Sequence, residues 1–195
     1  MKKSAILLLV LIIPATINSY AQPVGYTLTD QSALTIRGTS TLHDWECTVD
    51  DFTAQAQIRG DATSGETLVE HFSLVAWVKS IECGKGAMNK KTYEALKEKT
   101  HPAISFTVTN ASLASGINKG EPFDLDVEGD LIIAGITRAV SFPVKGQLLD
   151  SKQYQFDGSY KLNMKDYEVD PPSAMFGTVR AGEEVEIIFS VTLAP

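Results

Sequence analysis

Strict alternation of apolar and polar side chains is the feature that most constrains the fold of this chain. In the C-terminal segment every second residue is apolar, namely Val185, Ile187, Phe189, Val191 and Leu193. Side chains two residues apart lie on the same face of a β-strand. The same period recurs in seven earlier segments, at residues 34–36, 52–58, 72–78, 104–108, 125–133, 140–148 and 154–162. The alternation therefore predicts about eight strands, each with one apolar face.

The connections between these segments indicate antiparallel strands. Residues 150–152 and 134–136 form turns short enough for hairpins. One stretch, residues 88–99, is rich in Lys, Glu, Ala and Leu and predicts a helix. Pro102 ends it, since proline disfavours a helical conformation at the residue before it. We expect an all-β domain, either a barrel or a sandwich, with one short helix in a connecting loop.

Residues 1–21 have the pattern of a secretory signal peptide. Two lysines open the chain, residues 5–13 are an unbroken apolar run, and Ser19 and Ala21 supply small side chains ahead of Gln22. Nine apolar residues are too few to cross a bilayer, which takes about 20. We therefore expect a periplasmic or secreted protein that does not span a membrane.

Residues 22–195 have a suitable length for one domain. Loss of Lys2 and Lys3 with the signal peptide lowers the net charge from −7 to −9. Such a protein repels phosphate backbones, so nucleic acid is not an expected partner. The three histidines lack metal-ligand spacing, and neither a metal nor a cofactor is expected. The sequence leaves a homodimer open.

Cys47 and Cys83 are the only cysteines. Exported proteins form disulfides, and a loop of this length would gain roughly 3–4 kcal/mol from closure. The alternative is a pair of separate buried thiols. No CxxC motif is present, which argues against a redox or metal role.

The interior of an eight-stranded barrel is either filled by side chains or holds one small ligand. The inward positions combine aromatic rings with small residues: Ala54, Ala56, Ala76 and Gly158. Small residues leave space, although they can also fit a tapering core. The inward positions carry almost no charge, so a ligand there would be long and hydrophobic, gaining about 0.8 kcal/mol for each buried methylene.

Four motifs in order resemble the YceI-like family of lipocalin-like, polyisoprenoid-binding proteins. They lie at residues 38–45, 93–106, 128–138 and 177–187. The resemblance implies an eight-stranded antiparallel lipocalin-like barrel without a cofactor or catalytic activity. It also implies an isoprenoid or other long-chain amphiphile in the pore, and we expect an isoprenoid quinone, polyprenyl or fatty-acid-like molecule as the ligand. The chain departs from the family pattern at Cys47, Cys83 and residues 171–177.

The candidate ligand-binding residues combine the inward positions with adaptable side chains near the predicted pore mouth. They are Trp45, Ala54, Ala56, Phe72, Leu74, Ala76, Met88, Phe106, Leu131, Phe142, Tyr160, Met164, Met175 and Phe176. His43 and Asp44 are candidates for contact with a polar headgroup. Alternatively, Asp44 caps backbone amides at a bend and Trp45 packs in the core.

Two other function classes remain open. The first is a protein-interaction module with a solid core, which would carry an exposed apolar patch. The second is a hydrolase in which His43 is the base, Asp44 orients it and Ser40 or Ser73 is the nucleophile. Adjacent strand residues point to opposite faces, which disfavours a His43–Asp44 relay. A GxSxG elbow is also absent from the sequence. A carrier of a hydrophobic ligand is the preferred interpretation.

Overall fold

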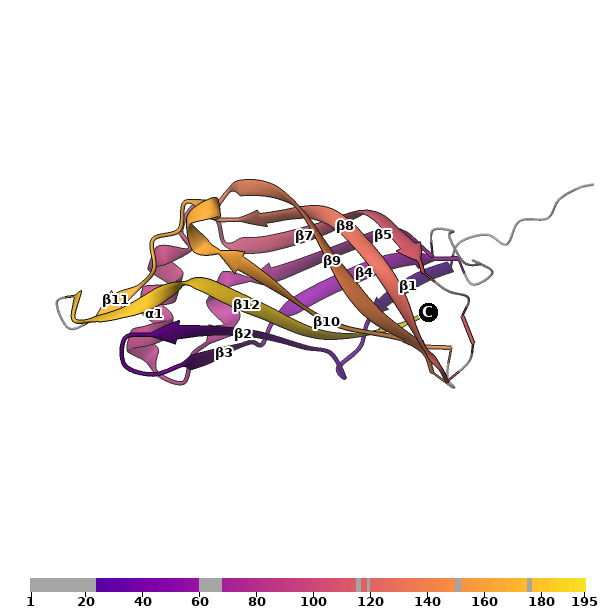
Figure 1. The fold of residues 1–195 in the computed structure, drawn as a ribbon, viewed down its shortest axis with the longest axis horizontal. Coiled ribbons are helices and arrows are strands. Elements are labelled where there is room, and N and C mark those ends of the chain that lie inside the picture. Colours follow the sequence, from indigo (N-terminus) through magenta and orange to yellow (C-terminus); the bar gives the residue numbers. More distant parts are fainter. Residues whose placement is uncertain (1–23, 60–67, 115–116, 119, 150–151, 175–176) are drawn as a thin grey trace, which may run out of the picture.

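The computed structural model describes residues 24–59, 68–114, 117–118, 120–149, 152–174 and 177–195. They form an elongated barrel with a helix near one end (Figure 1). The predicted signal peptide, residues 1–21, lies outside the described residues, as do Met175 and Phe176. Within the described part, no helix has the length and apolar character needed to cross a membrane.

Eight antiparallel strands form a closed ring. Neighbours pair in the order β1, β4, β5, β7, β8, β9, β10 and β12, and β1 also pairs with β12 through Thr27–Ala194 and Leu28–Leu193. The predicted eight-stranded antiparallel barrel is thereby confirmed. The ring strands are β1 (Val24–Leu28), β4 (Phe52–Ile58), β5 (Val69–Trp77), β7 (Ala103–Leu113), β8 (Pro122–Ile133), β9 (Ile136–Leu148), β10 (Tyr154–Asn163) and β12 (Val179–Ala194).

A second set of strands extends the wall at the helix end. β12 pairs with β1 near its C-terminus and with β2 over most of its remaining length. From β2 the order continues to β3 and β6, and short β11 pairs with the start of β12. The predicted strand at residues 34–36 is β2, which lies outside the closed ring. These strands are β2 (Ala33–Ser40), β3 (Trp45–Val49), β6 (Ile81–Glu82) and β11 (Ser173–Ala174).

Helix α1 spans Gly86–Ala95, so it begins earlier and ends earlier than the predicted residues 88–99. The chain turns away at Lys97, whose φ of 56° is left-handed. The amides of Thr100 and His101 then donate to the Lys97 carbonyl oxygen at 3.0 and 2.9 Å. A local turn therefore ends the helix before Pro102 can. Two 3-10 helices, η1 (Val78–Ser80) and η2 (Met164–Tyr167), complete the described helices.

The predicted hairpin at residues 134–136 is confirmed as a two-residue turn between β8 and β9. Ala134 and Gly135 both have positive φ, 50° and 85°. This combination is typical of a type I′ turn, whose twist matches that of the strands it joins. The turn lies at the helix end, because the Gly135 backbone packs against the His101 ring.

Aromatic rings fill the barrel interior at the end opposite α1, here called the closed end. Tyr26 and Tyr154 pack edge to face at 5.5 Å between ring centroids, and Tyr154 stacks on Phe156 at 6.1 Å. Phe123 contacts Phe156 edge to face at 6.5 Å. Phe123, Tyr154 and Phe156 are buried in one core cluster, and Tyr26 packs against it, so these rings fill this end of the interior.

Several interior rings lie over a glycine on the neighbouring strand. Phe189 covers Gly158, where an added Cβ would lie 2.6 Å from the ring. Phe123 covers Gly146 in the same way. The prediction that Gly158 leaves space in the lumen is therefore wrong, since the ring of Phe189 occupies it. Glycines here let large rings enter a narrow barrel.

Substitution of Gly146 by Ala tests this packing. We expect the free energy of unfolding to fall by roughly 1–3 kcal/mol, because the new methyl group overlaps the buried Phe123 ring. Gly25→Ala is the matched control, since nothing lies within 4 Å of its added Cβ. Urea unfolding of both variants measures the difference. Equal stabilities would contradict the ring-over-glycine packing.

Candidate ligand-binding site

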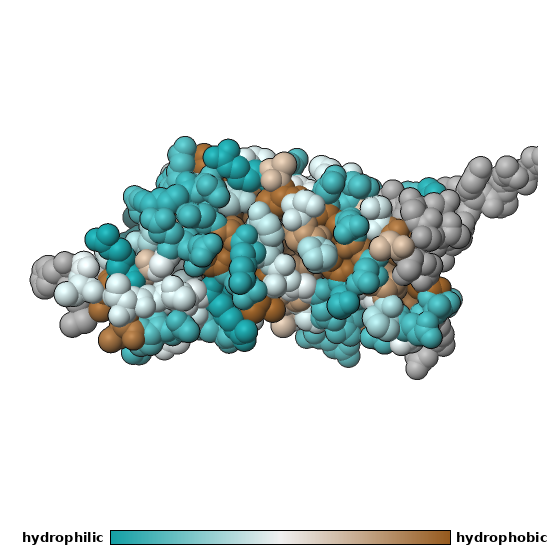
Figure 2. Space-filling view, in the orientation of Figure 1, coloured by the Kyte–Doolittle hydropathy of each residue, from teal (hydrophilic) through white to brown (hydrophobic). Residues whose placement is uncertain are grey.

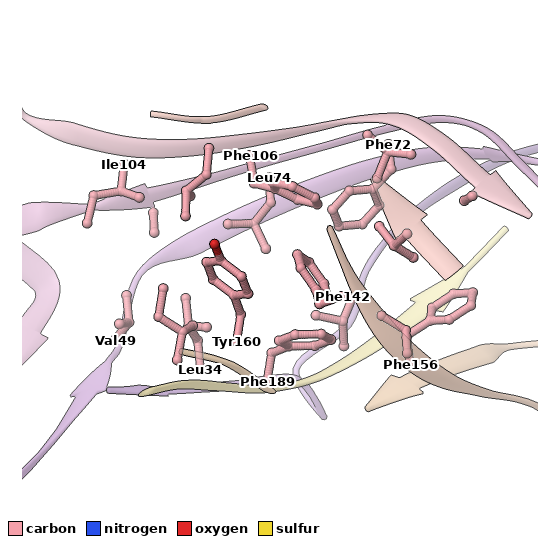
Figure 3. Close-up of a pocket in the computed structure, with 18 of the residues that line it drawn as sticks. Leu34, Val49, Phe72, Leu74, Ile104, Phe106, Phe142, Phe156, Tyr160 and Phe189 are labelled. Atoms are coloured by element: carbon pink, nitrogen blue, oxygen red, sulfur yellow. The ribbon is translucent and has the colours of Figure 1, made fainter. Parts of the chain in front are cut away.

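An apolar cavity of about 150 Å³ lies inside the barrel and is here called the inner cavity. Figure 3 shows aromatic rings from opposite walls pointing into it. Phe142 lies 5.6 Å from Phe106, 5.3 Å from Tyr160 and 5.9 Å from Phe189, measured between ring centroids. The Tyr160 hydroxyl is the only side-chain oxygen among its described lining residues. The inner cavity therefore accommodates hydrocarbon rather than polar groups.

A larger cavity of about 500 Å³ lies at the helix end and is here called the mouth cavity. One helical face of α1 contributes Met88, Thr92 and Ala95, at the spacing that places side chains on one side of a helix. The opposite walls come from β2, β3, β12 and η2. Other lining residues include Ser40, Leu42, His43, Trp45, Lys85, Lys91, Met164, Tyr167, Val169, Val185 and the two cysteines.

The inner and mouth cavities adjoin at four isoleucines. Ile36, Ile81, Ile104 and Ile187 line both of them. The combined space is apolar along its depth, is widest beside α1 and ends against the aromatic cluster of the closed end. Its size falls in the range of small-molecule sites, about 300–1,000 Å³.

A disulfide between Cys47 and Cys83 joins β3 to the segment before α1. β3 and β6 share only two residue pairs, Thr48–Glu82 and Val49–Ile81. Buried Asn89 strengthens this junction, because its side-chain oxygen accepts from the Cys83 amide at 2.8 Å and its amide donates to Glu82 at 2.6 Å. The disulfide and Asn89 therefore hold the start of α1 against the barrel.

The bend between β2 and β3 is organised by Ser40. Its hydroxyl donates to the His43 carbonyl oxygen at 2.7 Å and accepts from the amides of Leu42 and His43 at 3.2 Å. The sequence-based alternative gave this capping role to Asp44, which was wrong. The Nδ1 of His43 donates to the Asp44 carbonyl oxygen at 2.7 Å. Both His43 and Asp44 are exposed, and only His43 lines the mouth cavity.

Trp45 closes one side of the mouth cavity. Its indole nitrogen donates to the Thr39 carbonyl oxygen at 2.9 Å, and its ring lies over Gly38. This hydrogen bond fixes the ring plane, as expected for a half-buried indole. Trp45 thus both packs locally and contributes apolar surface to the mouth cavity.

The structure distributes the other predicted ligand-binding residues between three environments. The residues that line the inner cavity are Phe72, Leu74, Ala76, Phe106, Leu131, Phe142 and Tyr160. Met88 and Met164 line the mouth cavity. Ala54 and Ala56 instead lie buried in a core cluster, against which Phe72 and Leu74 pack, and line neither cavity.

Sequence reasoning identified Met88 but missed Thr92 and Ala95 on the same face of α1, and it also missed the lysines at the cavity rim. The spacing of Met88, Thr92 and Ala95 is a helical signal that was available, but Lys85 and Lys91 carry no motif of their own. Tyr167 was also missed. Among the described residues, no cluster of His, Cys, Asp and Glu side chains could hold a metal ion.

Tyr167 is a buried phenol beside the mouth cavity. Its hydroxyl has no hydrogen-bond partner among the described residues. Burial, reinforced by nearby Tyr160 and Asp166 and opposed by Arg138, raises the pKa of Tyr167 to about 12. Burial also raises the pKa of Tyr160. Both phenols therefore stay neutral at physiological pH.

Comparison with known proteins agrees with this geometry. A family model described as the YceI-like domain matches residues 26–193. The chain belongs to the YceI-like family. A comparison with curated protein sequences found no match.

Solved structures that this chain resembles in fold include BcnA of Burkholderia cenocepacia, with 20% identity over 85% of this chain and 97% of that chain and a TM-score of 0.65. A polyisoprenoid binding domain from Saccharophagus degradans has 17% identity over 87% and 98%, with a TM-score of 0.66. The YceI protein of Campylobacter jejuni has 12% identity over 75% and 82%, with a TM-score of 0.59. At these identities the similarity concerns the fold.

Replacement of both cysteines by serine tests the clamp on α1. We expect the free energy of unfolding to fall by about 4 kcal/mol, because the disulfide closes a loop with a sequence separation of 36. Urea unfolding measures the loss. A reducing agent should destabilise the wild type and leave the double variant unchanged. Equal sensitivity of both proteins would contradict the prediction.

Substitution of Tyr167 by Phe tests the unpartnered hydroxyl. At pH 7 we expect unchanged stability or a gain of up to about 1 kcal/mol, because no hydrogen bond is lost. Above about pH 10 the unfolded phenol ionises before the folded one, so the wild type loses up to about 1.4 kcal/mol per pH unit from this residue. The variant should lack that part of the loss. Urea unfolding at pH 7 and pH 11 compares them, and identical losses would refute the assignment.

Proposed function

We propose that this protein is an exported carrier that binds a long-chain hydrophobic molecule, an isoprenoid or a fatty-acid-like lipid, inside its barrel. The observation that carries the proposal is the pair of adjoining apolar cavities, which narrows from α1 toward the aromatic cluster of the closed end. Membership of the YceI-like family supports it. The polyisoprenoid-binding description of the Saccharophagus degradans neighbour supports the ligand class.

The shape of the site favours one orientation of the ligand. Hydrocarbon suits the inner cavity, where each methylene removed from water contributes about 0.8 kcal/mol. A polar head suits the mouth cavity, which His43, Lys85 and Lys91 line. A chain of about twenty carbons would gain roughly 16 kcal/mol before the loss of its rigid-body and internal freedom. Binding therefore needs few specific polar contacts, and the bore and length of the cavities set selectivity.

An exported location is part of the proposal. The signal-like pattern of residues 1–21 supports it. The Cys47–Cys83 disulfide is independent support, because such bonds persist in oxidising compartments such as the periplasm.

A hydrolase is the weaker candidate on geometric grounds. Ser40 uses its hydroxyl on the backbone of the β2–β3 bend, and the ring of His43 donates to a backbone carbonyl oxygen. Ser73 alternates with inward Phe72 and Leu74, so it faces the outer surface of β5. Neither serine is arranged as a nucleophile activated by His43. A solid-core interaction module is disfavoured by the cavities themselves.

The decisive experiment is extraction of purified protein with organic solvent, followed by mass spectrometry. We expect a long-chain lipid in near-stoichiometric amount from the wild type. Ile104→Trp should abolish it, because Ile104 lines both cavities and a larger ring closes the passage between them.

Ile132→Trp is the matched control for Ile104→Trp. Ile132 pairs with Ser105, the residue after Ile104, and is exposed on the outer wall. We expect this variant to retain the lipid. Absence of any lipid from wild-type protein would overturn the proposed function, and retention of lipid by folded Ile104→Trp would overturn the proposed passage.

A further inference from the structure

The rim of the mouth cavity has a charge opposite to that of the protein as a whole. The chain carries 24 acidic and 17 basic residues. Yet the charged side chains that line the mouth cavity within the described residues are Lys85 and Lys91, and no carboxylate lines it. Both lysines are exposed, and Lys91 makes only an exposed contact of 3.6 Å with Glu94. Exposed ion pairs of this kind constrain a side chain little.

A hydrophobic side chain protrudes from the same rim. Leu42 is 69% exposed, the largest exposure among the large apolar side chains that the structure describes as exposed. It lies at the tip of the β2–β3 bend, which the Ser40 hydroxyl holds in place through its hydrogen bonds to Leu42 and His43. Because Leu42 also lines the mouth cavity, its exposure faces the entrance and not a remote part of the wall.

We infer that this rim, formed by Leu42, Lys85 and Lys91, docks on a bilayer surface that carries anionic lipid headgroups. The inference rests on the proposed function, since a carrier of a bilayer-soluble chain must meet the membrane that supplies it. Lysines on a surface segment are attracted to anionic headgroups. An exposed apolar side chain at the same rim, such as Leu42, can enter the interface.

The charge of the remaining surface gives the docking a direction. The acidic protein as a whole is repelled by an anionic bilayer, so the cationic rim is the part that can approach. In that orientation the mouth cavity faces the lipid. The chain of a ligand then passes between bilayer and barrel without crossing water, where each exposed methylene is unfavourable.

Vesicle sedimentation tests the inference on residues 22–195, which contain every described strand and helix and lack the apolar run at residues 5–13 that would itself bind lipid. The vesicles contain either phosphatidylcholine alone or phosphatidylcholine with phosphatidylglycerol. We expect binding to the anionic vesicles only, with loss of binding at 0.5 M NaCl because salt screens exposed charges.

Two triple variants locate the surface. The rim variant is Leu42→Ser, Lys85→Gln and Lys91→Gln. The matched variant, Val24→Ser, Lys145→Gln and Lys152→Gln, removes the same charge and an exposed apolar side chain from the closed end. We expect the rim variant to lower the vesicle partition coefficient by more than about tenfold, and the matched variant to bind like wild type.

The outcomes separate this inference from the proposed function. Ile104→Trp should lose its lipid and still bind anionic vesicles, because the rim is intact. Equal binding by the rim and matched variants, or no binding of wild type to anionic vesicles, overturns the docking surface. Either result leaves lipid extraction as an independent test of the carrier. If lipid is absent from wild type and vesicle binding persists, the carrier proposal fails, and so does the role of docking in loading it.

Discussion

The rest of the structure depends on the two different pairing partners of β12 along its length. This strand has sixteen residues and pairs with β1 at its C-terminal end and with β2 over most of the rest. Pairing with β1 closes the ring at the end where the aromatic cluster fills the interior. Pairing with β2 carries the wall beyond the ring, where β3 and β6 continue it. One strand therefore produces a tight end and a wide end in the same barrel.

The two ends are finished by different chemistry. At the closed end, glycines such as Gly146 make room for aromatic rings, which fill the cross-section. At the wide end, the described rings of Trp45 and Tyr167 border the mouth cavity without filling it, and α1 lies beside the opening (Figure 1). The Cys47–Cys83 disulfide and the hydrogen bonds of Asn89 together hold that helix against the short β3–β6 ladder. On the face shown in Figure 2, polar side chains cover most of the surface, and apolar ones show between them in the middle of the molecule.

Alternation predicted most ring strands well, because a strand that buries one face shows an apolar residue at every second position of the sequence. Most long ring strands, from β4 to β12, carry at least three alternating apolar residues in sequence. β3 carries the same signal in Trp45, Cys47 and Val49. Only a short polar break separates these residues from the apolar residues of β4, so the sequence alone did not distinguish β3 as a separate strand. β1 was missed because five residues give a weak pattern. Strand existence is local information, whereas closure through β1 depends on pairing partners far apart in the chain.

The candidate site was harder to predict, because the volume at a position depends on its neighbours. Ala76 lines the inner cavity, while Ala54 and Ala56, equally small and equally inward, lie buried among other core side chains. Gly158 is filled by a ring that lies 31 positions further along the chain, at Phe189. Residue size alone cannot distinguish these cases. The sequence also could not predict that Lys85 and Lys91 lie at the cavity rim, because only the packing of α1 against the barrel brings them there.

The aromatic cluster at the closed end has one further consequence for the way a ligand enters and leaves. A tube that is stoppered at one end admits and releases its contents by the same route, so a chain that enters tail first must leave head first. A barrel that is closed at one end cannot pass a ligand straight through from one side to the other. In the proposed carrier function, the whole protein would therefore have to reorient in solvent between the surface that loads it and the surface that unloads it.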